Sequence, residues 1–171
     1  MNFRDLTADE IECRVQSVKQ NGLVLLLYKD ARCDMKILDE TVGAEAWQRE
    51  HYECKGNLFC RVGIDVNMIA GCATPRWVFK SDCGTESNTE AQKGEASDSF
   101  KRACFNWGIG RELYTAPFIW IDAKNCNINN GKCYDKFEVE KIAIENKKIV
   151  GLAIRNITKG VRAFVWQANA K

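Results

Sequence analysis

The chain of 171 residues carries 25 Lys and Arg against 23 Asp and Glu, and 46% of its residues are hydrophobic. This balance excludes a disordered chain, which combines low hydrophobicity with high net charge, and it predicts a folded globular body. The longest apolar run, Leu23 to Tyr28, is far shorter than the roughly 18 to 20 residues that span a bilayer. Because the first residues, Met1 to Glu10, also lack the pattern of a secretory signal, we expect a cytoplasmic protein without a membrane partner.

Nine cysteines stand in the sequence, and their spacing does not indicate a metal site. The nearest pairs, Cys54 with Cys60 and Cys126 with Cys133, are wider apart than the roughly two to four residues of a zinc knuckle. His51 is the only histidine, so the sequence offers no Ser/His or Cys/His couple for nucleophilic catalysis. We therefore expect structural thiols in a reducing compartment, without zinc or another cofactor.

The amino-terminal part is expected to form a short helix, a hairpin and a second helix. Thr7 and Glu10 have the spacing of a capping box. The strand-like segments 12–19 and 23–28 flank Asn21-Gly22, a pair that favours a type I′ turn because both residues tolerate positive φ. Residues 31–42 place apolar side chains at helical intervals before Gly43, which predicts an amphipathic helix.

The rest of the chain predicts two groups of strands around one long helix. Three strand-like segments predict an antiparallel sheet: Trp47 to Lys55, Asn57 to Val66 and Arg76 to Cys83. The segment from Thr89 to Trp107 contains no Pro and has an apolar stripe at helical spacing, so a helix that ends at Gly108 is predicted. Three alternating segments then predict a meander: Phe137 to Glu145, Ile149 to Asn156 and Val161 to Trp166.

The predicted fold class is therefore α+β, with an antiparallel β-sheet packed on a long helix and a C-terminal three-strand β meander. We place the core in residues 1–123 and the meander in residues 124–171, within the same globular unit. The first segment has a net charge of −4 and the second a net charge of +6. This asymmetry indicates a basic carboxy-terminal surface, for which a solvated charged face is the simpler explanation.

The long predicted helix also carries positive charge. Lys93, Ser97 and Lys101 lie four residues apart and share a face beside the apolar stripe, and Arg102 follows Lys101. Two adjacent cations at the polar edge of a buried helix are suited to binding a phosphate backbone. Because the same helix also carries several carboxylates, an ordinary solvated face is the simpler explanation of the charge pattern by itself.

The stretch from Lys93 to Gly108, KGEASDSFKRACFNWG, resembles the signature helix of the Rad52-type single-strand annealing proteins, including their bacteriophage recombinase relatives. In that family a helix of small residues ends in an aromatic residue or Leu, then Lys-Arg-Ala, and a Gly a few residues later. Residues 32–47, which contain Asp-Glu-Thr-Val-Gly and end at Trp47, are similar to another helix of the family. The resemblance covers about Leu23 to Tyr114, a little over half of the chain.

This resemblance implies a β-β-β-α core with a twisted sheet, assembled into rings that carry single-stranded DNA in a basic groove around the outside. On this chain Lys101 and Arg102 correspond to phosphate contacts. Arg32, or its neighbour Cys33, corresponds to the basic residue of the first motif. Further candidates for DNA contact lie near these segments or on the meander, which is outside the resemblance: Lys29, Lys80, Lys93, Lys147, Lys148 and Arg162.

The implied function is ATP-independent annealing of complementary DNA strands in homologous recombination and DNA repair, by a phage-encoded protein in a bacterial host cell. No enzyme is required, because pairing is downhill once phosphate charge is neutralised. Gly108-Ile109-Gly110 lacks the Lys-Ser or Lys-Thr of a phosphate-binding loop. The expected partners are single-stranded DNA and further copies of the chain, with a single-strand-binding protein or an exonuclease as additional candidates.

Three other functions fit parts of the sequence. A single-stranded DNA-binding module without annealing activity would stack bases on Trp77, Trp107 or Trp120, although the apolar stripe favours a core position for Trp107. A protein that keeps the fold but serves only as an interaction module is the second. A metal-dependent nuclease would need clustered carboxylates beside a lysine, and its candidates are Asp82, Glu86, Glu95 and Asp98 with Lys80 or Lys101.

Overall fold

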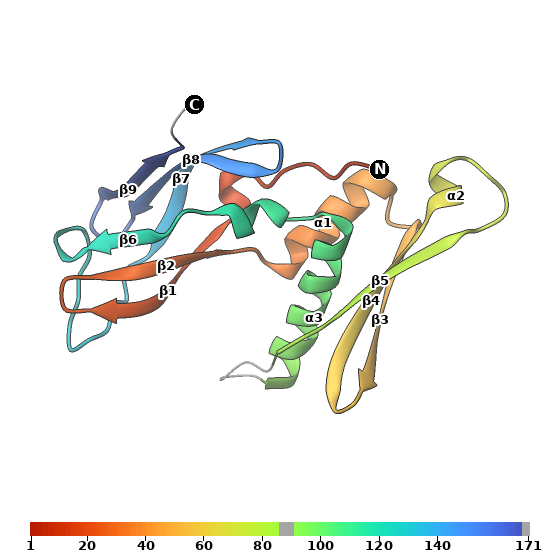
Figure 1. The fold of residues 1–171 in the computed structure, drawn as a ribbon, viewed down its shortest axis with the longest axis horizontal. Coiled ribbons are helices and arrows are strands. Elements are labelled where there is room, and N and C mark those ends of the chain that lie inside the picture. The colour runs from red at the N-terminus through yellow and green to blue at the C-terminus, as the bar shows by residue number, and fades with distance from the viewer. Residues whose placement is uncertain (86–90, 169–171) are drawn as a thin grey trace. The chain divides into compact units, whose positions relative to one another are not determined.

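The computed structural model describes residues 1–85 and 91–168, with the side chains of residues 91–93 left out. Its elements are two antiparallel sheets and a small number of helices, so the α+β class is confirmed (Figure 1). No helix within the described residues is both long enough and apolar enough to cross a membrane.

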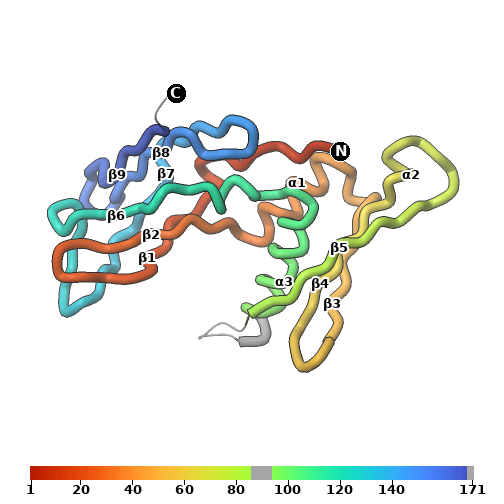
Figure 2. The backbone as a smooth tube through the Cα atoms, viewed as in Figure 1, coloured from red at the N-terminus to blue at the C-terminus, as the bar shows by residue number. Residues whose placement is uncertain are grey.

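The chain divides into two compact units, and each is built from separate stretches of sequence. The three-stranded unit contains Met1–Arg4 and Ala31–Gly110, and the six-stranded unit contains Asp5–Asp30 and Arg111–Lys171. In Figure 2 the chain can be followed from β2 into α1 and later from α3 back toward β6. The sequence-based boundary between residues 123 and 124 does not coincide with this division, because strands from both sides of it share one sheet.

The three-stranded unit holds the sheet β3-β4-β5, in which all pairs are antiparallel. Its elements in chain order are α1 (Ala31–Val42), β3 (Trp47–Cys54), β4 (Asn57–Asp65), α2 (Val66–Ile69), β5 (Trp77–Cys83) and α3 (Ala91–Trp107). α1 occupies the residues for which the sequence predicts a helix, and α3 lies within its predicted segment. The predicted strands differ from the observed ones by one residue at one end.

Helix α3 covers one face of this sheet and supplies much of the unit's core. Phe100, Ala103 and Cys104 of α3 have no exposed surface, and neither do Val62 and Ile64 of β4. Because strand side chains alternate between the two faces, the second face of the sheet carries a different set of residues. Figure 1 shows α3 running along one side of the three strands.

The six-stranded unit holds a sheet with the order β6-β2-β1-β7-β8-β9, again antiparallel at every pair. Its strands are β1 (Glu12–Lys19), β2 (Gly22–Tyr28), β6 (Ile119–Asp122), β7 (Phe137–Glu145), β8 (Lys148–Asn156) and β9 (Val161–Gln167). Short 3-10 turns lie at Ala8–Glu10, Arg111–Thr115 and Ala123–Asn125. The meander β7-β8-β9 is therefore part of a larger sheet, joined to it through β1.

The predicted type I′ turn at Asn21-Gly22 is wrong by one residue. The turn is formed by Gln20 and Asn21, neither of which has a positive φ, and Gly22 is the first residue of β2. A Cβ atom on Gly22 would lie 2.4 Å from the carbonyl oxygen of Ile121 and 2.6 Å from the ring of Trp120, both in the neighbouring strand β6. Gly22 thus permits the close approach of β6 and does not supply the turn.

Candidate nucleic-acid interface

The cations predicted to bind phosphate lie in the middle of α3, between residues that anchor the helix. Phe100, Ala103 and Cys104 are fully buried, whereas Lys101 and Arg102 are partly exposed. The ring of Phe100 stacks on Trp47 of β3 with a centroid separation of 6.2 Å. Packing on both sides of the pair therefore holds the helix, and with it the two cations, in a fixed position on the sheet.

Arg102 is engaged by the sheet, and this limits the charge that it can offer. Its Nε lies 3.2 Å from Oδ1 of Asp82 on β5, and the two side chains are 42% and 24% exposed. Asn106, one turn further along α3, donates to the carbonyl oxygen of Ser81 at 3.0 Å. For Lys101, by contrast, no ion pair or hydrogen bond of the ammonium is found within the described residues.

Lys80 of β5 lies against the carboxy-terminal end of α3. Its Nζ donates to the main-chain oxygen of Asn106 at 2.8 Å and stands 4.8 Å from the centroid of the Trp107 ring. A cation at this end of a helix satisfies a carbonyl that has no partner within the helix and complements the helix dipole. Trp107 is partly exposed rather than in the deep core, and its Nε1 donates to the oxygen of Val62. The half-buried side chain of Lys80 is therefore held by contacts within its own unit.

The remaining residues near the motifs that were predicted to contact DNA differ in their exposure to solvent. Arg32 is exposed on the first turn of α1, whereas the alternative Cys33 is buried at 8% exposure. The side chain of Lys93 lies outside the described residues. Lys29 belongs to the six-stranded unit and is buried, with 7% of its surface exposed, so it does not present a free ammonium surface to a ligand.

Two of the three meander cations are held by carboxylates of their own unit. Lys147 lies 2.7 Å from Asp5. Arg162 donates to both oxygens of Glu140, at 2.6 and 2.9 Å, and these hydrogen bonds hold the pKa of the Glu140 carboxyl below its ordinary value. Lys148 is exposed at the start of β8.

The carboxylates considered for a nuclease have structural partners instead. Asp82 binds Arg102, Glu95 accepts the main-chain N–H of Leu58 at 3.0 Å, and Asp98 accepts both the N–H and the hydroxyl of Thr85 at 3.1 Å. Glu86 lies outside the described residues. Within the described part of the chain, no three His, Cys, Asp or Glu side chains are grouped so that they could hold a metal ion.

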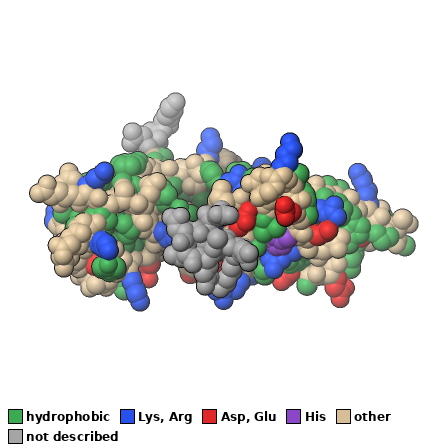
Figure 3. All heavy atoms as spheres, turned by 90° about the horizontal axis from the view of Figure 1, so that it is seen from below, with side chains coloured by type: hydrophobic (Ala, Val, Ile, Leu, Met, Phe, Trp, Pro, Cys, Tyr) green, Lys and Arg blue, Asp and Glu red, His purple; other side chains and the backbone are tan. Residues whose placement is uncertain are grey.

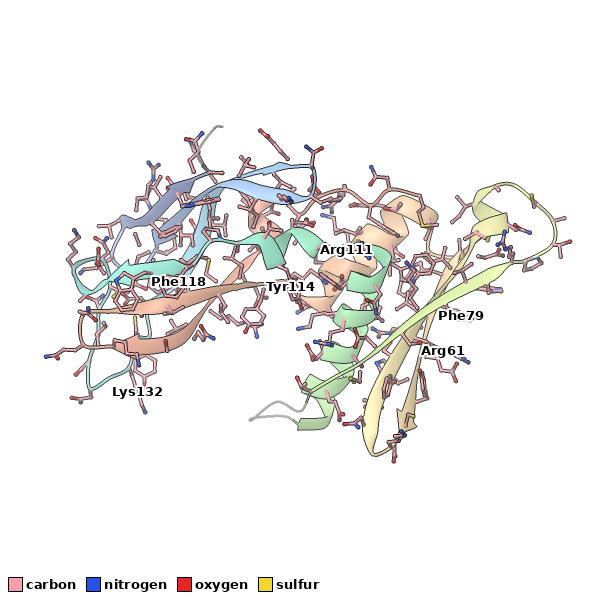
Figure 4. All side chains as sticks on the ribbon, viewed as in Figure 1. Arg61, Phe79, Arg111, Tyr114, Phe118 and Lys132 are labelled. Carbon is pink, nitrogen blue, oxygen red and sulfur yellow. The ribbon has the colours of Figure 1, made fainter. Side chains whose placement is uncertain are left out.

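Several aromatic side chains that the sequence did not single out are exposed in the structure. Phe79 and Arg61 occupy neighbouring strands β5 and β4, and Tyr114 and Phe118 of the six-stranded unit are 74% and 73% exposed (Figure 4). On the face drawn in Figure 3, Lys and Arg side chains are dispersed among hydrophobic and acidic ones rather than gathered in one patch. The available signal was the alternation within the predicted strands, which assigns Arg61 and Phe79 to the face opposite the buried residues.

Comparison with known proteins identifies the family of the chain. A profile of the Rad52/22 family of double-strand break repair proteins matches residues 4–132. The single-stranded DNA-binding protein DdrA of Deinococcus radiodurans is 32% identical over 108 residues, which are 62% of this chain and 48% of that protein. The chain thus spans about half the length of this relative, and no solved structure matches it. Since the family profile extends over most of the sequence, the chain belongs to the Rad52/22 family of double-strand break repair proteins.

Proposed function

We propose that this protein binds single-stranded DNA and promotes the annealing of complementary strands without ATP, in DNA repair and recombination. The observation that carries the proposal is the Lys101-Arg102 pair on α3, held in place by buried neighbours within a chain of the Rad52/22 family. The similarity to a single-stranded DNA-binding protein supports the choice of ligand.

The chemistry required of the site is modest. Two strands repel each other through their phosphates, and a protein that neutralises this charge lets stacking and base pairing proceed downhill. Lys101 provides an available ammonium for this task. Arg102 places a second positive charge next to it, with its Nε donating to Asp82.

The proposal also includes assembly into a homo-oligomeric ring and an origin in a bacteriophage, both of which rest on the family resemblance. Candidate protein partners are a single-strand-binding protein and an exonuclease, which would respectively cover and produce the single strand. Within the six-stranded unit, the exposed Lys148 is a further candidate contact for DNA.

The test measures binding and annealing separately. Fluorescence anisotropy with a labelled oligonucleotide gives affinity, and two complementary labelled strands mixed without ATP give the annealing rate. We expect both activities, with no loss of strand length when Mg²⁺ is added. Tight binding without accelerated annealing would reduce the function to a single-stranded DNA-binding module, and shortening of the strands in Mg²⁺ would favour a nuclease.

A further inference from the structure

The face of the three-stranded sheet that points away from α3 carries a continuous row of flat side chains. The planar row consists of Trp77 and Phe79 of β5, Arg61 and Phe59 of β4, and Tyr52 of β3. Neighbours in the row are close: the rings of Trp77 and Phe79 are 6.2 Å apart, Phe79 and the Arg61 guanidinium 5.2 Å, Arg61 and Tyr52 6.0 Å, and Tyr52 and Phe59 5.6 Å. The row therefore crosses all three strands.

The planar row is open to solvent on this face. Phe79 is 44% exposed, and Trp77 and Tyr52 are each 36% exposed. Figure 4 shows Arg61 and Phe79 on the side of β4 and β5 away from α3. The aromatic pairs at the two ends of the row are nearly parallel, with interplanar angles of 25° and 22°.

Gly63 of β4 explains how Phe79 presents its ring. Gly63 lies opposite Phe79 in the strand pairing, and a Cβ atom added to it would meet the Phe79 ring at 2.4 Å. Because this Cβ is missing, the ring rests against the backbone of β4 with one side. In this position Phe79 keeps 44% of its surface exposed.

Arg61 is fixed in the row by its own partner. Glu50 lies directly opposite Arg61 in the strand pairing and accepts hydrogen bonds from its Nε and Nη2 at 2.9 and 2.6 Å. This ion pair places the guanidinium between two rings and neutralises its charge locally. The row thus offers flat surfaces for stacking and little net charge.

The composition of this face selects for a ligand with flat aromatic groups. The aliphatic side chains of these strands, Leu58, Val62, Ile64 and Val78, alternate with the planar row and so belong to the α3 side. On the outward side the large apolar residues are all aromatic. Nucleobases stack on aromatic rings and guanidinium planes exposed on a sheet. Because protein interfaces are also rich in aromatic residues and Arg, a second copy of the chain is the competing occupant, and the oligomer mass distinguishes the two.

We propose that the planar row is a binding site for unpaired nucleobases of single-stranded DNA, separate from the phosphate contacts on α3. This inference rests on the proposed single-stranded DNA binding and adds the part of the ligand that the sheet recognises. Phosphates would be held by Lys101, and bases of a bound strand would stack on the row that includes Phe79 and Trp77. Stacking is tolerant of sequence because every base has a flat face.

The experiment compares two strands of equal charge. An oligothymidylate of about 20 nucleotides and an abasic strand of the same length share their phosphates and differ only in their bases. We expect the wild-type protein to bind oligothymidylate at least about fivefold more tightly than the abasic strand. Equal affinity for the two strands would overturn the inference without any variant, and failure to bind either strand would overturn the proposed function as well.

Variants then assign the preference to the planar row. The double substitution Trp77→Leu and Phe79→Leu should lower the affinity for oligothymidylate at least about fivefold and leave the affinity for the abasic strand unchanged. Phe79→Tyr, which keeps the ring, should behave like wild type. Phe118→Leu is the matched control, because Phe118 is exposed and outside the row. An equal loss for both strands, or a change in oligomer mass with the base preference intact, would refute base stacking at this face.

Discussion

The two neighbouring cations of α3 should respond differently to mutation. Lys101→Ala removes an ammonium without a partner in the described structure, so we expect it to weaken DNA binding and leave folding unchanged. Arg102→Ala also removes the ion pair with Asp82. It should therefore cost stability, and its effect on binding should be smaller than that of Lys101→Ala, because Asp82 already competes with phosphate for the Arg102 guanidinium.

The expected magnitudes follow from exposure and charge. The Arg102–Asp82 pair is 42% and 24% exposed, and such partly exposed pairs contribute about 0.2–1 kcal/mol to the free energy of unfolding. Lys101→Ala should change that free energy by no more than about 0.5 kcal/mol. Each lost phosphate contact lowers the slope of log affinity against log salt by about 0.7 for single strands. Between about 50 and 200 mM salt, this narrows the affinity gap between wild type and Lys101→Ala roughly 2.6-fold.

Salt titrations by fluorescence anisotropy measure this slope, and urea unfolding measures stability. Lys36→Ala serves as the control, since Lys36 is an exposed lysine of the same unit that pairs with Glu40. Asp82→Asn should strengthen binding by releasing Arg102 from its anion. If Lys101→Ala retains the wild-type slope while Lys36→Ala lowers it, the assignment of the phosphate contact to α3 is wrong.

Three further expectations follow from individual residues. Gly22→Ala should destabilise the six-stranded unit by about 1–3 kcal/mol in chemical unfolding, because the added Cβ would overlap the backbone of β6. Gly151→Ala, whose added Cβ has its nearest contact at 3.3 Å, should lower the free energy of unfolding by less. Main-chain hydrogen bonds, of which the one from Arg76 has the largest effect, lower the pKa of Asp65. The contribution of Asp65 to stability should therefore be present above its ordinary pKa of 3.8 and be lost as pH falls through the lowered pKa. Asp65→Asn should flatten this part of the profile of unfolding free energy against pH. Burial raises the pKa of the Cys60 thiol to about 11, so in the native protein iodoacetamide at pH 8 should label the exposed Cys54 and spare Cys60; equal labelling would contradict this.

Elements with a strong local pattern were predictable from the sequence. The helical spacing of apolar residues and the following Gly43 defined α1 over Ala31–Val42. The pairing of strands far apart in the sequence was not predictable, because alternation indicates that a segment is a strand without indicating which strand lies next to it. Glu12 pairs with Glu138, so the expected meander shares a sheet with the first hairpin. On the other side of that hairpin, Leu23 pairs with Ile121 of β6.

The candidate site was predictable only in part for the same reason. The adjacent cations of α3 could be found from the helix pattern, but the carboxylate that holds Arg102 comes from β5, at position 82. Lys80 was a plausible surface cation in the sequence, and its contact with Asn106 at the end of α3 depends on how the helix crosses the sheet. Gly22 was misassigned because a glycine next to Asn has two explanations, a turn or close packing, and only the position of β6 distinguishes them.

The discontinuous composition of the two units has a consequence for the order of folding. β2 ends at Tyr28 and its partner β6 begins at Ile119, so pairing them closes a connection of roughly 90 residues. For a flexible connection this closure costs about 3 kcal/mol more than for one of about four residues. If the segment Ala31–Gly110 has already folded, it no longer samples the conformations of a flexible chain, and part of that entropic cost disappears. We therefore expect the segment Ala31–Gly110 to fold early during synthesis. The hairpin of β1 and β2 gains its neighbour β6 only after residues 119–122 have been made.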